Sequence, residues 1–454
     1  MTPVSFLQIT LGSQAVSITP ALDLFPLLTG TLAAVSCGLL GNFLVLRRLS
    51  LMGDAISHSV LPGLVVAVLL AGSLSVPAMF AGAAVAGVLT VVLVELVKRL
   101  GRVEPGAAMG VVFSILFAGG VLLLERHLGD GVHLDADCVL EGQLETLWWP
   151  GGPQTWSGVL SFETLRATPR QVWVLAGALL VSGVVIAALF KELRLAAFDA
   201  GLATSLGFNA GVLHVLLMTL VAVATVASFE AVGSILVVAM LICPAATARL
   251  LTDRVPSQIW VSIAVSLFCG VVGYLSATIV PAAFGKESVS AAGSIACTAG
   301  VVLGGTIVLS PRHGVAARSI RRRRFAARAA VEDLLAALYR FAETGVTSVP
   351  TDRIRALLAG RPADAAIAAA VRSGAVRRDR GLLSLTPTGV AQGAGRVRKH
   401  RLWEHYLVER AGVAPDHVHS SAEHLEHTAV RPPAGPVQDP HGREIPTESQ
   451  AHGP

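Results

Sequence analysis

Long apolar stretches fill the chain between residues 24 and 310 and decide what it can fold into. A helix crosses a bilayer with about 20 apolar residues, because each backbone N–H and C=O must be hydrogen-bonded within the segment. The sequence predicts an all-α, multi-pass membrane protein with about nine spans, or eight if the nearly continuous sixth and seventh form one hairpin. The stretches lie near residues 24–46, 57–74, 77–98, 107–124, 172–190, 212–229, 232–250, 259–281 and 289–310.

Basic residues gather after the odd-numbered spans. Loops that stay in the cytoplasm carry an excess of Lys and Arg. We therefore expect the N-terminus outside and the C-terminal part in the cytoplasm, and these loops account for the net charge of +5. The residues concerned are Arg47 and Arg48, Lys98, Arg99 and Arg102, Lys191 and Arg194, Arg249 and Arg254, and Arg321 to Arg324.

The second apolar stretch begins with two polar residues, Asp54 and His58, in LMGDAISHSVLPG. A carboxylate within hydrocarbon costs roughly 2.5–3.5 kcal/mol, so it marks a functional site by default. The i, i+4 spacing places both side chains on one helix face, and an oxygen with an imidazole nitrogen suits a divalent transition metal. The structural alternative is that Asp54 caps the helix and His58 hydrogen-bonds within the bundle. Pro62 and Gly63 predict a kink.

The same stretch carries a family resemblance. GDAISHSVLPG, preceded by LGNFLVLRRLSLM, resembles the second-helix motif of the membrane subunits of ABC importers for manganese, zinc or iron. AVGSILVVAMLICPAATARLL resembles the same family, and the likeness covers residues 22–310. It implies a permease in the plasma (inner) membrane of a bacterium, with Asp54 and His58 in the transport path. Manganese is the first expectation for the substrate, with zinc or iron next.

The resemblance also implies partners. HLDADCVLEGQLE resembles the outer loop that faces an extracytoplasmic metal-binding protein, within the loop 125–171. A second permease subunit, identical or paralogous, and membrane lipid complete the expected surroundings. FDAGLATSLG resembles the coupling segment that docks on a separate ABC ATPase, with four residues matching its pattern: Phe198, Asp199, Ala203 and Gly207.

The chain carries no ATPase motif of its own. The nearest fragment to a P-loop, FGKES at 284–288, lacks the upstream glycine and the hydroxyl after the lysine. We therefore expect a transport subunit rather than an enzyme, with ATP hydrolysis by a separate subunit and no organic cofactor. An ion-coupled secondary metal carrier would also bury an Asp and a His, but it gives no reason for a coupling segment.

The chain after the last span is polar, and its sequence pattern predicts several distinct regions. We expect a transmembrane permease domain at 1–311 and a basic juxtamembrane linker at 312–330. Three helical patterns and a β-hairpin at 331–390 outline a winged helix. A metal-binding and dimerisation region follows at 391–446, and the tail 447–454 is expected to be disordered.

HRLWEHYLV followed by AEHLEH resembles the metal-binding and dimerisation region of repressors of the diphtheria-toxin-repressor type, which depend on manganese or iron. The resemblance implies metal ligands at His400, Glu423, Glu426 and His427, and a further one at Asp333 on the first helix. Carboxylates and imidazoles without thiolate suit manganese or iron(II), and zinc would also bind.

The chain departs from those repressors in two places. It has Ala336 where the manganese sensors place an acid, and the recognition-helix segment, PADAAIAAAVRSGAV, has Arg372 as its only cation. Helices that read DNA present several Arg, Lys, Asn or Gln side chains. We therefore expect a metal-sensing or regulatory extension that does not bind DNA, although a membrane-anchored, metal-responsive transcriptional regulator is the alternative.

Overall fold

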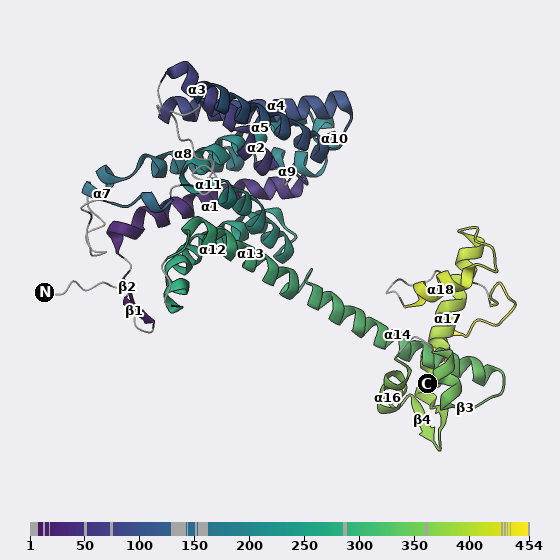
Figure 1. Ribbon diagram of the computed structural model, residues 1–454. Helices are drawn as coiled ribbons and strands as arrows, with labels where there is room; N and C mark the ends of the chain where they lie inside the picture. The colour runs from purple at the N-terminus through teal and green to yellow at the C-terminus, as the bar shows by residue number, and fades with distance from the viewer. Residues whose placement is uncertain are drawn as a thin grey trace. The chain divides into compact units, whose positions relative to one another are not determined.

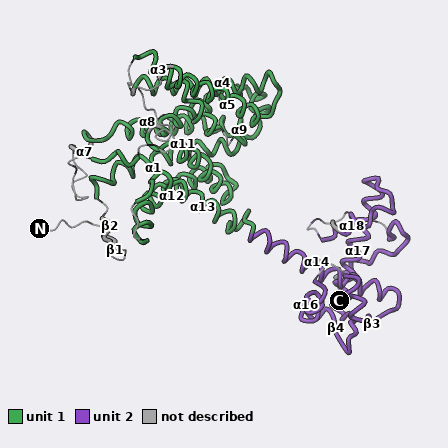
Figure 2. Tube along the Cα trace, viewed as in Figure 1, with its two compact units in different colours: residues 1–315 green, residues 316–454 purple. Residues whose placement is uncertain are grey.

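The structure is a computed structural model that falls into two compact units, residues 1–315 and 316–454 (Figure 2). It describes residues 8–11, 14–17, 19–49, 52–72, 76–128, 142, 144–149, 152, 162–284, 288–358, 362–427, 430, 433, 435 and 437–452. Most of the expected binding-protein loop, 125–171, therefore lies outside the described residues.

The first unit is a helical bundle (Figure 1). Nine helices or helix segments within its described residues are long and apolar enough to span a membrane, which confirms the predicted fold class. A short hairpin of β1 (Gln8–Leu11) and β2 (Gln14–Ser17) precedes them. The helices are α1 (Pro20–Leu46), α2 (Met52–Ser59), α3 (Leu61–Ala71), α4 (Val76–Gly101), α5 (Pro105–Leu128), η2 (Leu144–Thr146), α7 (Phe162–Ala167), α8 (Arg170–Ala188), α9 (Phe190–Phe198), α10 (Ala200–Ser205), α11 (Ala210–Leu251), α12 (Val255–Ala283) and α13 (Ala291–Leu309).

The second span is interrupted, as its proline predicted. α2 ends at Ser59 and α3 begins at Leu61, while Val60 between them keeps helical backbone angles, φ −69° and ψ −29°. Pro62 lies in the first turn of α3, where its missing N–H costs no helical hydrogen bond. The next residue, Gly63, lets α3 approach α4 closely, because a Cβ there would come 2.3 Å from the carbonyl oxygen of Gly82. The break separates the α2 turn that carries the polar pair from the apolar α3.

The sixth and seventh spans meet at Gly233 within α11. The backbone there is non-helical, with φ 76° and ψ 171°, a conformation that favours glycine. The two parts of α11, before and after Gly233, form two arms that both pack beside α2. In the first arm Ala222 lies near Gly87 and Ile56, and in the second arm Leu241 lies against Gly53. The two arms are therefore separate spans that lie side by side, and the count is nine within the described residues.

The core of this unit forms around α1, which packs on α11, α12 and α8 (Figure 1). The closest approach is at Gly41, where a Cβ would lie 1.9 Å from the carbonyl oxygen of Leu241. Ser262 on α12 donates a 2.9 Å hydrogen bond to the carbonyl oxygen of Gly38. Small residues at these crossings let the helices pack closely, and this packing holds them together in lipid, where no hydrophobic driving force acts between helices.

The second unit begins with a winged helix. Its antiparallel sheet has the order β3-β5-β4, with Val349 paired to Leu383 and Arg378 also paired to Leu383 from the other side. Its core includes the buried Leu334, Ile354 and Ile367. The elements are α14 (Val315–Glu343), β3 (Ser348–Pro350), α15 (Thr351–Leu357), α16 (Ala363–Arg372), β4 (Val376–Asp379), β5 (Leu382–Leu385), α17 (Pro387–Glu409), α18 (Val418–Glu426) and α19 (Glu448–His452).

The tail corrects one expectation. Residues 447–454 were expected to be disordered, yet Glu448–His452 form α19, which packs against α17. Arg398 on α17 explains this order, because its Nη1 donates a 2.6 Å hydrogen bond to the carbonyl oxygen of Pro446. Buried Arg401 adds two hydrogen bonds to the Glu343 carboxylate and one to the carbonyl oxygen of Glu444.

Candidate metal-binding sites

The first candidate site is the Asp54–His58 pair on α2. The Nε2 atom of His58 lies 3.4 Å from Oδ1 of Asp54, as the i, i+4 spacing predicts. The imidazole also contacts two rings of α5, with ring centroids 5.4 Å from Phe113 and 5.8 Å from Phe117. Both polar side chains remain accessible on the surface of this single chain, 44% for Asp54 and 28% for His58.

Contacts of the neighbouring residues place this pair near the middle of the spans. Gly53 lies against Leu241, halfway along the span Ala231–Leu251. Ile56 lies against Gly87, near the middle of the span Pro77–Gly101. Next to His58 in the sequence, buried Ser59 fixes α2 on α4, with its hydroxyl 2.6 Å from that of Thr90. The carboxylate and imidazole therefore lie far from both ends of the bundle.

The pair alone is an incomplete metal site. Divalent transition metals take four or more ligands, whereas this pair provides two: one oxygen from Asp54 and one nitrogen from His58. Among the described residues, no group of three or more His, Cys, Asp or Glu that could hold a metal includes them. Further ligands must come from another chain, from the metal's own water or from residues outside those described.

The predicted coupling residues lie on α9, α10 and the turn that follows. Phe198 ends α9 and is 61% exposed, whereas Ala203 is fully buried. Asp199 begins α10 as its N-cap, accepting a 2.9 Å hydrogen bond from the N–H of Leu202. Gly207 has φ 90°, which allows the turn into α11. Together with exposed Leu206, this segment presents an apolar surface on a polar end of the bundle.

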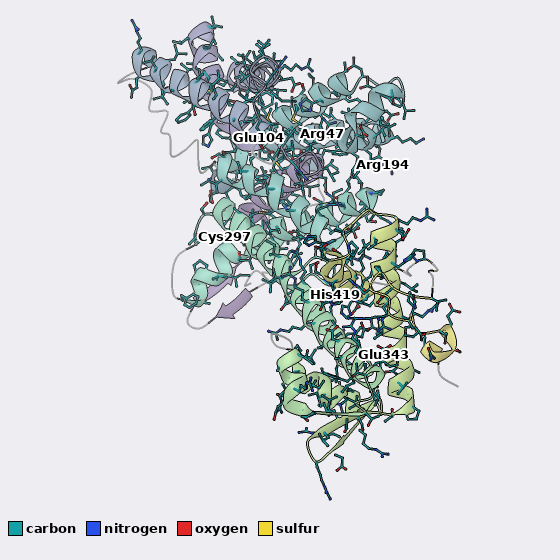
Figure 3. The ribbon with its side chains drawn as sticks, turned by 90° about the vertical axis from the view of Figure 1, so that its right-hand side faces the viewer. Arg47, Glu104, Arg194, Cys297, Glu343 and His419 are labelled. Carbon is teal, nitrogen blue, oxygen red and sulfur yellow. The ribbon has the colours of Figure 1, made fainter. Side chains whose placement is uncertain are left out.

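The second candidate site is a cluster of His400, Glu404 and His419 on α17 and α18, of which Figure 3 labels His419. The Nε2 atom of His400 lies 3.1 Å from Oε1 of Glu404 and 3.1 Å from Nδ1 of His419. His419 Nδ1 lies 2.8 Å from the same Glu404 oxygen. Three potential ligand atoms thus converge from two helices. The side chains of His400 and Glu404 are buried, and that of His419 is exposed.

A third cluster joins Asp333 on α14 to Glu426 and His427 at the end of α18. His427 Nε2 lies 3.1 Å from Oδ1 of Asp333 and 3.6 Å from Oε1 of Glu426, and it makes no hydrogen bond within the described residues. Its Nδ1 lies 2.7 Å from Glu332. If Nδ1–H donates to Glu332, the Nε2 lone pair faces two carboxylates, an arrangement that a cation would complete.

The two clusters share one carboxylate. Oε2 of Glu426 lies 2.5 Å from Nδ1 of His400, while its Oε1 faces His427. His400 and His427 are therefore oriented in the same way: Nδ1 of each ring lies beside a carboxylate, and Nε2 points toward the other potential ligand atoms of its cluster. Burial would lower the pKa of His400, but hydrogen bonds to Glu404 and Glu426 raise it overall. Burial would raise the pKa of Glu404, but the hydrogen bonds and positive charge of His400 and His419 outweigh this effect and lower that pKa to about 2.

The structure brings together Asp333, Glu426 and His427 of the predicted ligands, and places His400 in the adjoining cluster. Glu423 lies one turn earlier on α18, partly exposed, and belongs to neither group of converging atoms. Sequence reasoning missed three contributors: Glu404, His419 and Glu332. The signal for Glu404 was available, because it follows His400 by four residues within HRLWEHYLV.

The described residues thus form a bundle with nine helices or helix segments that are long and apolar enough to span a membrane, and the bundle carries a polar pair and, at one end, an exposed apolar turn. Residues 24–147 and 162–304, more than half of the chain, match the ABC 3 transport family, and the chain belongs to that family. Residues 386–431 match the iron dependent repressor, metal binding and dimerisation domain. These matches confirm both resemblances that the sequence suggested.

Individual relatives agree. The chain is 41% identical over 293 residues to the manganese transport system membrane protein MntD of Bacillus subtilis, covering 64% of this chain and 94% of that protein. It is 34% identical over 374 residues to the zinc transport system membrane protein TroD of Treponema pallidum, covering 82% and 97%. Among solved structures, PsaBC from Streptococcus pneumoniae in complex with Fab superposes with a TM-score of 0.50 at 28% identity, covering 64% and 92%.

Proposed function

We propose that the chain is the permease subunit of an ABC importer that carries a divalent transition metal into the cytoplasm, with manganese as the first substrate and zinc or iron next. The observation that carries this proposal is the Asp54–His58 pair at mid-depth of a bundle of the ABC 3 family. A carboxylate and an imidazole bind such ions without the thiolates that would favour softer metals.

The exposure of this pair supports a second permease subunit. An accessible carboxylate at the centre of a bilayer would cost roughly 2.5–3.5 kcal/mol, so the face of α2 and α5 that carries Asp54 and His58 needs a cover other than lipid. A second copy, or a paralogue, placed on this face would remove that cost. It would also add its own carboxylate and imidazole, giving four protein ligands around a path between the subunits.

The exposed turn at α9 and α10 supports a separate ATPase. The chain has no P-loop, and Phe198 and Leu206 present apolar side chains where a cytoplasmic partner could bind. The basic residues that follow the odd-numbered spans support the orientation, with this turn and the second unit in the cytoplasm. An extracytoplasmic metal-binding protein would then deliver the ion to the opposite side.

The second unit supports a metal-sensing role. His400, Glu404 and His419 would hold one ion, and Asp333, Glu426 and His427 would hold another. Glu423, one turn before Glu426 on α18, would join the Asp333 cluster only if its side chain moved. An ion there would tie α14 to α17 and α18. DNA binding has little support, because the exposed side of α16 carries Arg372 as its only cation. Its other exposed residues are Asp364, Ala365, Ala368 and Val371.

The test is uptake of manganese, zinc and iron by cells that express the chain with or without its ATPase. We expect accumulation that requires the ATPase and is abolished by Asp54→Ala or His58→Ala, while assembly with the ATPase is unchanged. His313→Ala is the matched control, since His313 is an exposed histidine, 3.1 Å from Asp253 and outside the spans. Uptake that does not need the ATPase would instead indicate a secondary carrier.

A further inference from the structure

A polar network joins three helices at the end of the bundle that also carries α9 and α10. Arg47 follows α1 directly, Glu95 lies in the last turns of α4, and His214 lies in the second turn of α11 (Figure 3 labels Arg47). Arg47 Nη1 is 2.8 Å from His214 Nδ1, and His214 Nε2 is 3.5 Å from Glu95 Oε2. Lys98 and Arg99 hold the same Glu95 carboxylate at 2.9 and 2.7 Å.

Donor and acceptor chemistry gives this network a direction. A guanidinium can only donate, so His214 Nδ1 must accept from Arg47. The imidazole is then neutral, with its proton on Nε2 facing the carboxylate of Glu95. A single tautomer of His214 thus connects α1 to α4 through α11, and neither an apolar side chain nor a lysine could replace it in both contacts.

The network adjoins the two parts of the permease that must move together. His214 follows α10 closely, because α11 starts after the Asn209 cap, and a Cβ on Gly211 would lie 3.6 Å from Arg99 Nη2. On the other side, Arg47 caps the end of α1 and lies five residues before Met52, where α2 begins. Glu95 is on α4, against which α2 is fixed through Thr90. The network therefore connects the proposed ATPase-docking turn to both supports of the Asp54–His58 helix.

Arg47 is held in an unusual way for a residue at a helix end. Its Nε and Nη2 atoms are buried and make no hydrogen bond within the described residues, whereas its neighbour Arg48 is exposed. A buried guanidinium with few acceptors is costly, and a merely solubilising arginine would leave its head group in water. His214 is the acceptor that the described structure gives it, so a displacement of α11 changes the environment of Arg47 directly.

We propose that Arg47, His214 and Glu95 transmit movement of the ATPase-docking turn to the metal-binding helix α2. This inference rests on the proposed import function. His214 is a positioning residue: it contacts no substrate, and it acts by making the first turns of α11 move together with the end of α1 and the end of α4. Closure of the ATPase dimer displaces α10, α11 follows, and the network passes that displacement to the two elements that position Asp54 and His58.

The test uses the full chain assembled with its ATPase in lipid vesicles, and measures manganese accumulation and ATP hydrolysis in the same preparation. His214→Phe keeps the ring volume and removes both contacts. His214→Gln keeps an acceptor for Arg47 and a donor for Glu95. The matched control is His313→Phe, at a histidine outside the network.

We expect His214→Phe to lower the number of manganese ions moved per ATP hydrolysed by about tenfold, which lies within the range of roughly 5- to 150-fold for coupling between sites, while ATP hydrolysis stays within about twofold. His214→Gln and His313→Phe should stay within about threefold of the unsubstituted transporter. Combining His214→Phe with Glu95→Gln should lower the ratio no further, because both interrupt one connection.

An unchanged ratio in His214→Phe would overturn the proposal, and so would an equal loss in His214→Gln, which would mean that the site tolerates only the native ring. Failure of the import function is distinct, since the unsubstituted complex itself would then accumulate no manganese with ATP.

Discussion

Replacing Glu426 by Gln should weaken metal binding at both clusters of the second unit with one substitution. Its Oε2 lies 2.5 Å from His400 Nδ1 and its Oε1 lies 3.6 Å from His427 Nε2. The amide keeps the size of the side chain but removes its charge and one acceptor. The third cluster thereby loses an anionic ligand, and the second loses the charged partner that orients His400.

The size of the effect follows from these contacts. Loss of an orienting partner typically costs 10- to 100-fold in metal affinity, or about 1.4–2.8 kcal/mol. At a metal concentration of about 100 times the native Kd, a bound ion stabilises the native fold by about 2.7 kcal/mol. With a 100-fold weaker Kd the same concentration gives only about 0.4 kcal/mol, and with a tenfold weaker Kd about 1.4 kcal/mol.

The assay is denaturant unfolding of the second unit at increasing manganese, together with direct counting of bound ions. Glu404→Gln should weaken only the cluster that contains His419, whereas Glu426→Gln should weaken both. Glu409→Gln, an exposed substitution at the end of α17, is the matched control and should change neither. Weakening of a single site by Glu426→Gln would refute the shared carboxylate.

Two further predictions concern stability. Gly41→Ala should destabilise the bundle by about 1–3 kcal/mol, because its Cβ would lie 1.9 Å from the carbonyl oxygen of Leu241. Gly300→Ala, where a Cβ meets nothing within 4 Å, should be neutral in the same thermal unfolding in detergent, and equal losses would contradict the packing argument. The metal-free second unit should be most stable between pH 4.5 and 6.5, the ordinary pKa values of Glu and His. The raised pKa of His400 means that its contribution is lost as pH rises through the folded value, and the lowered pKa of Glu404 means that its contribution is lost as pH falls toward 2. A flat profile of unfolding midpoint against pH would contradict this.

The membrane architecture was predictable because lipid leaves the backbone few choices. Each stretch of about 20 apolar residues must be a helix, and the structure has nine such spans within its described residues. The reversal between the sixth and seventh spans was not decidable from hydropathy. It depends on one residue, Gly233, whose positive φ ends one span and begins the next.

The polar sites were predictable only where neighbours in sequence are neighbours in space. Asp54 and His58 are four residues apart on one helix, so their proximity follows from helix geometry. Glu332 and His427 are 95 residues apart, and their contact depends on how α14 and α18 pack. His214 lies half-buried between Arg47 at the end of α1 and Glu95 on α4, a position that hydropathy cannot indicate.

The ordered tail illustrates the same limit. TESQAHGP has the polar composition of a disordered end, yet Glu448–His452 form a helix because Arg398 on α17 binds the carbonyl oxygen of Pro446 just before it. A contact made by an arginine about 50 residues upstream leaves no trace in the local sequence. Composition alone therefore understated the order of the second unit.

The central claim is that ATP drives a divalent metal past Asp54 and His58. The most direct measurement is manganese accumulation in vesicles that contain the full chain, its ATPase and the metal-binding protein, with and without ATP. We predict ATP-dependent accumulation that Asp54→Ala abolishes without loss of the assembled complex. Accumulation by Asp54→Ala at the rate of the unsubstituted transporter would contradict the account.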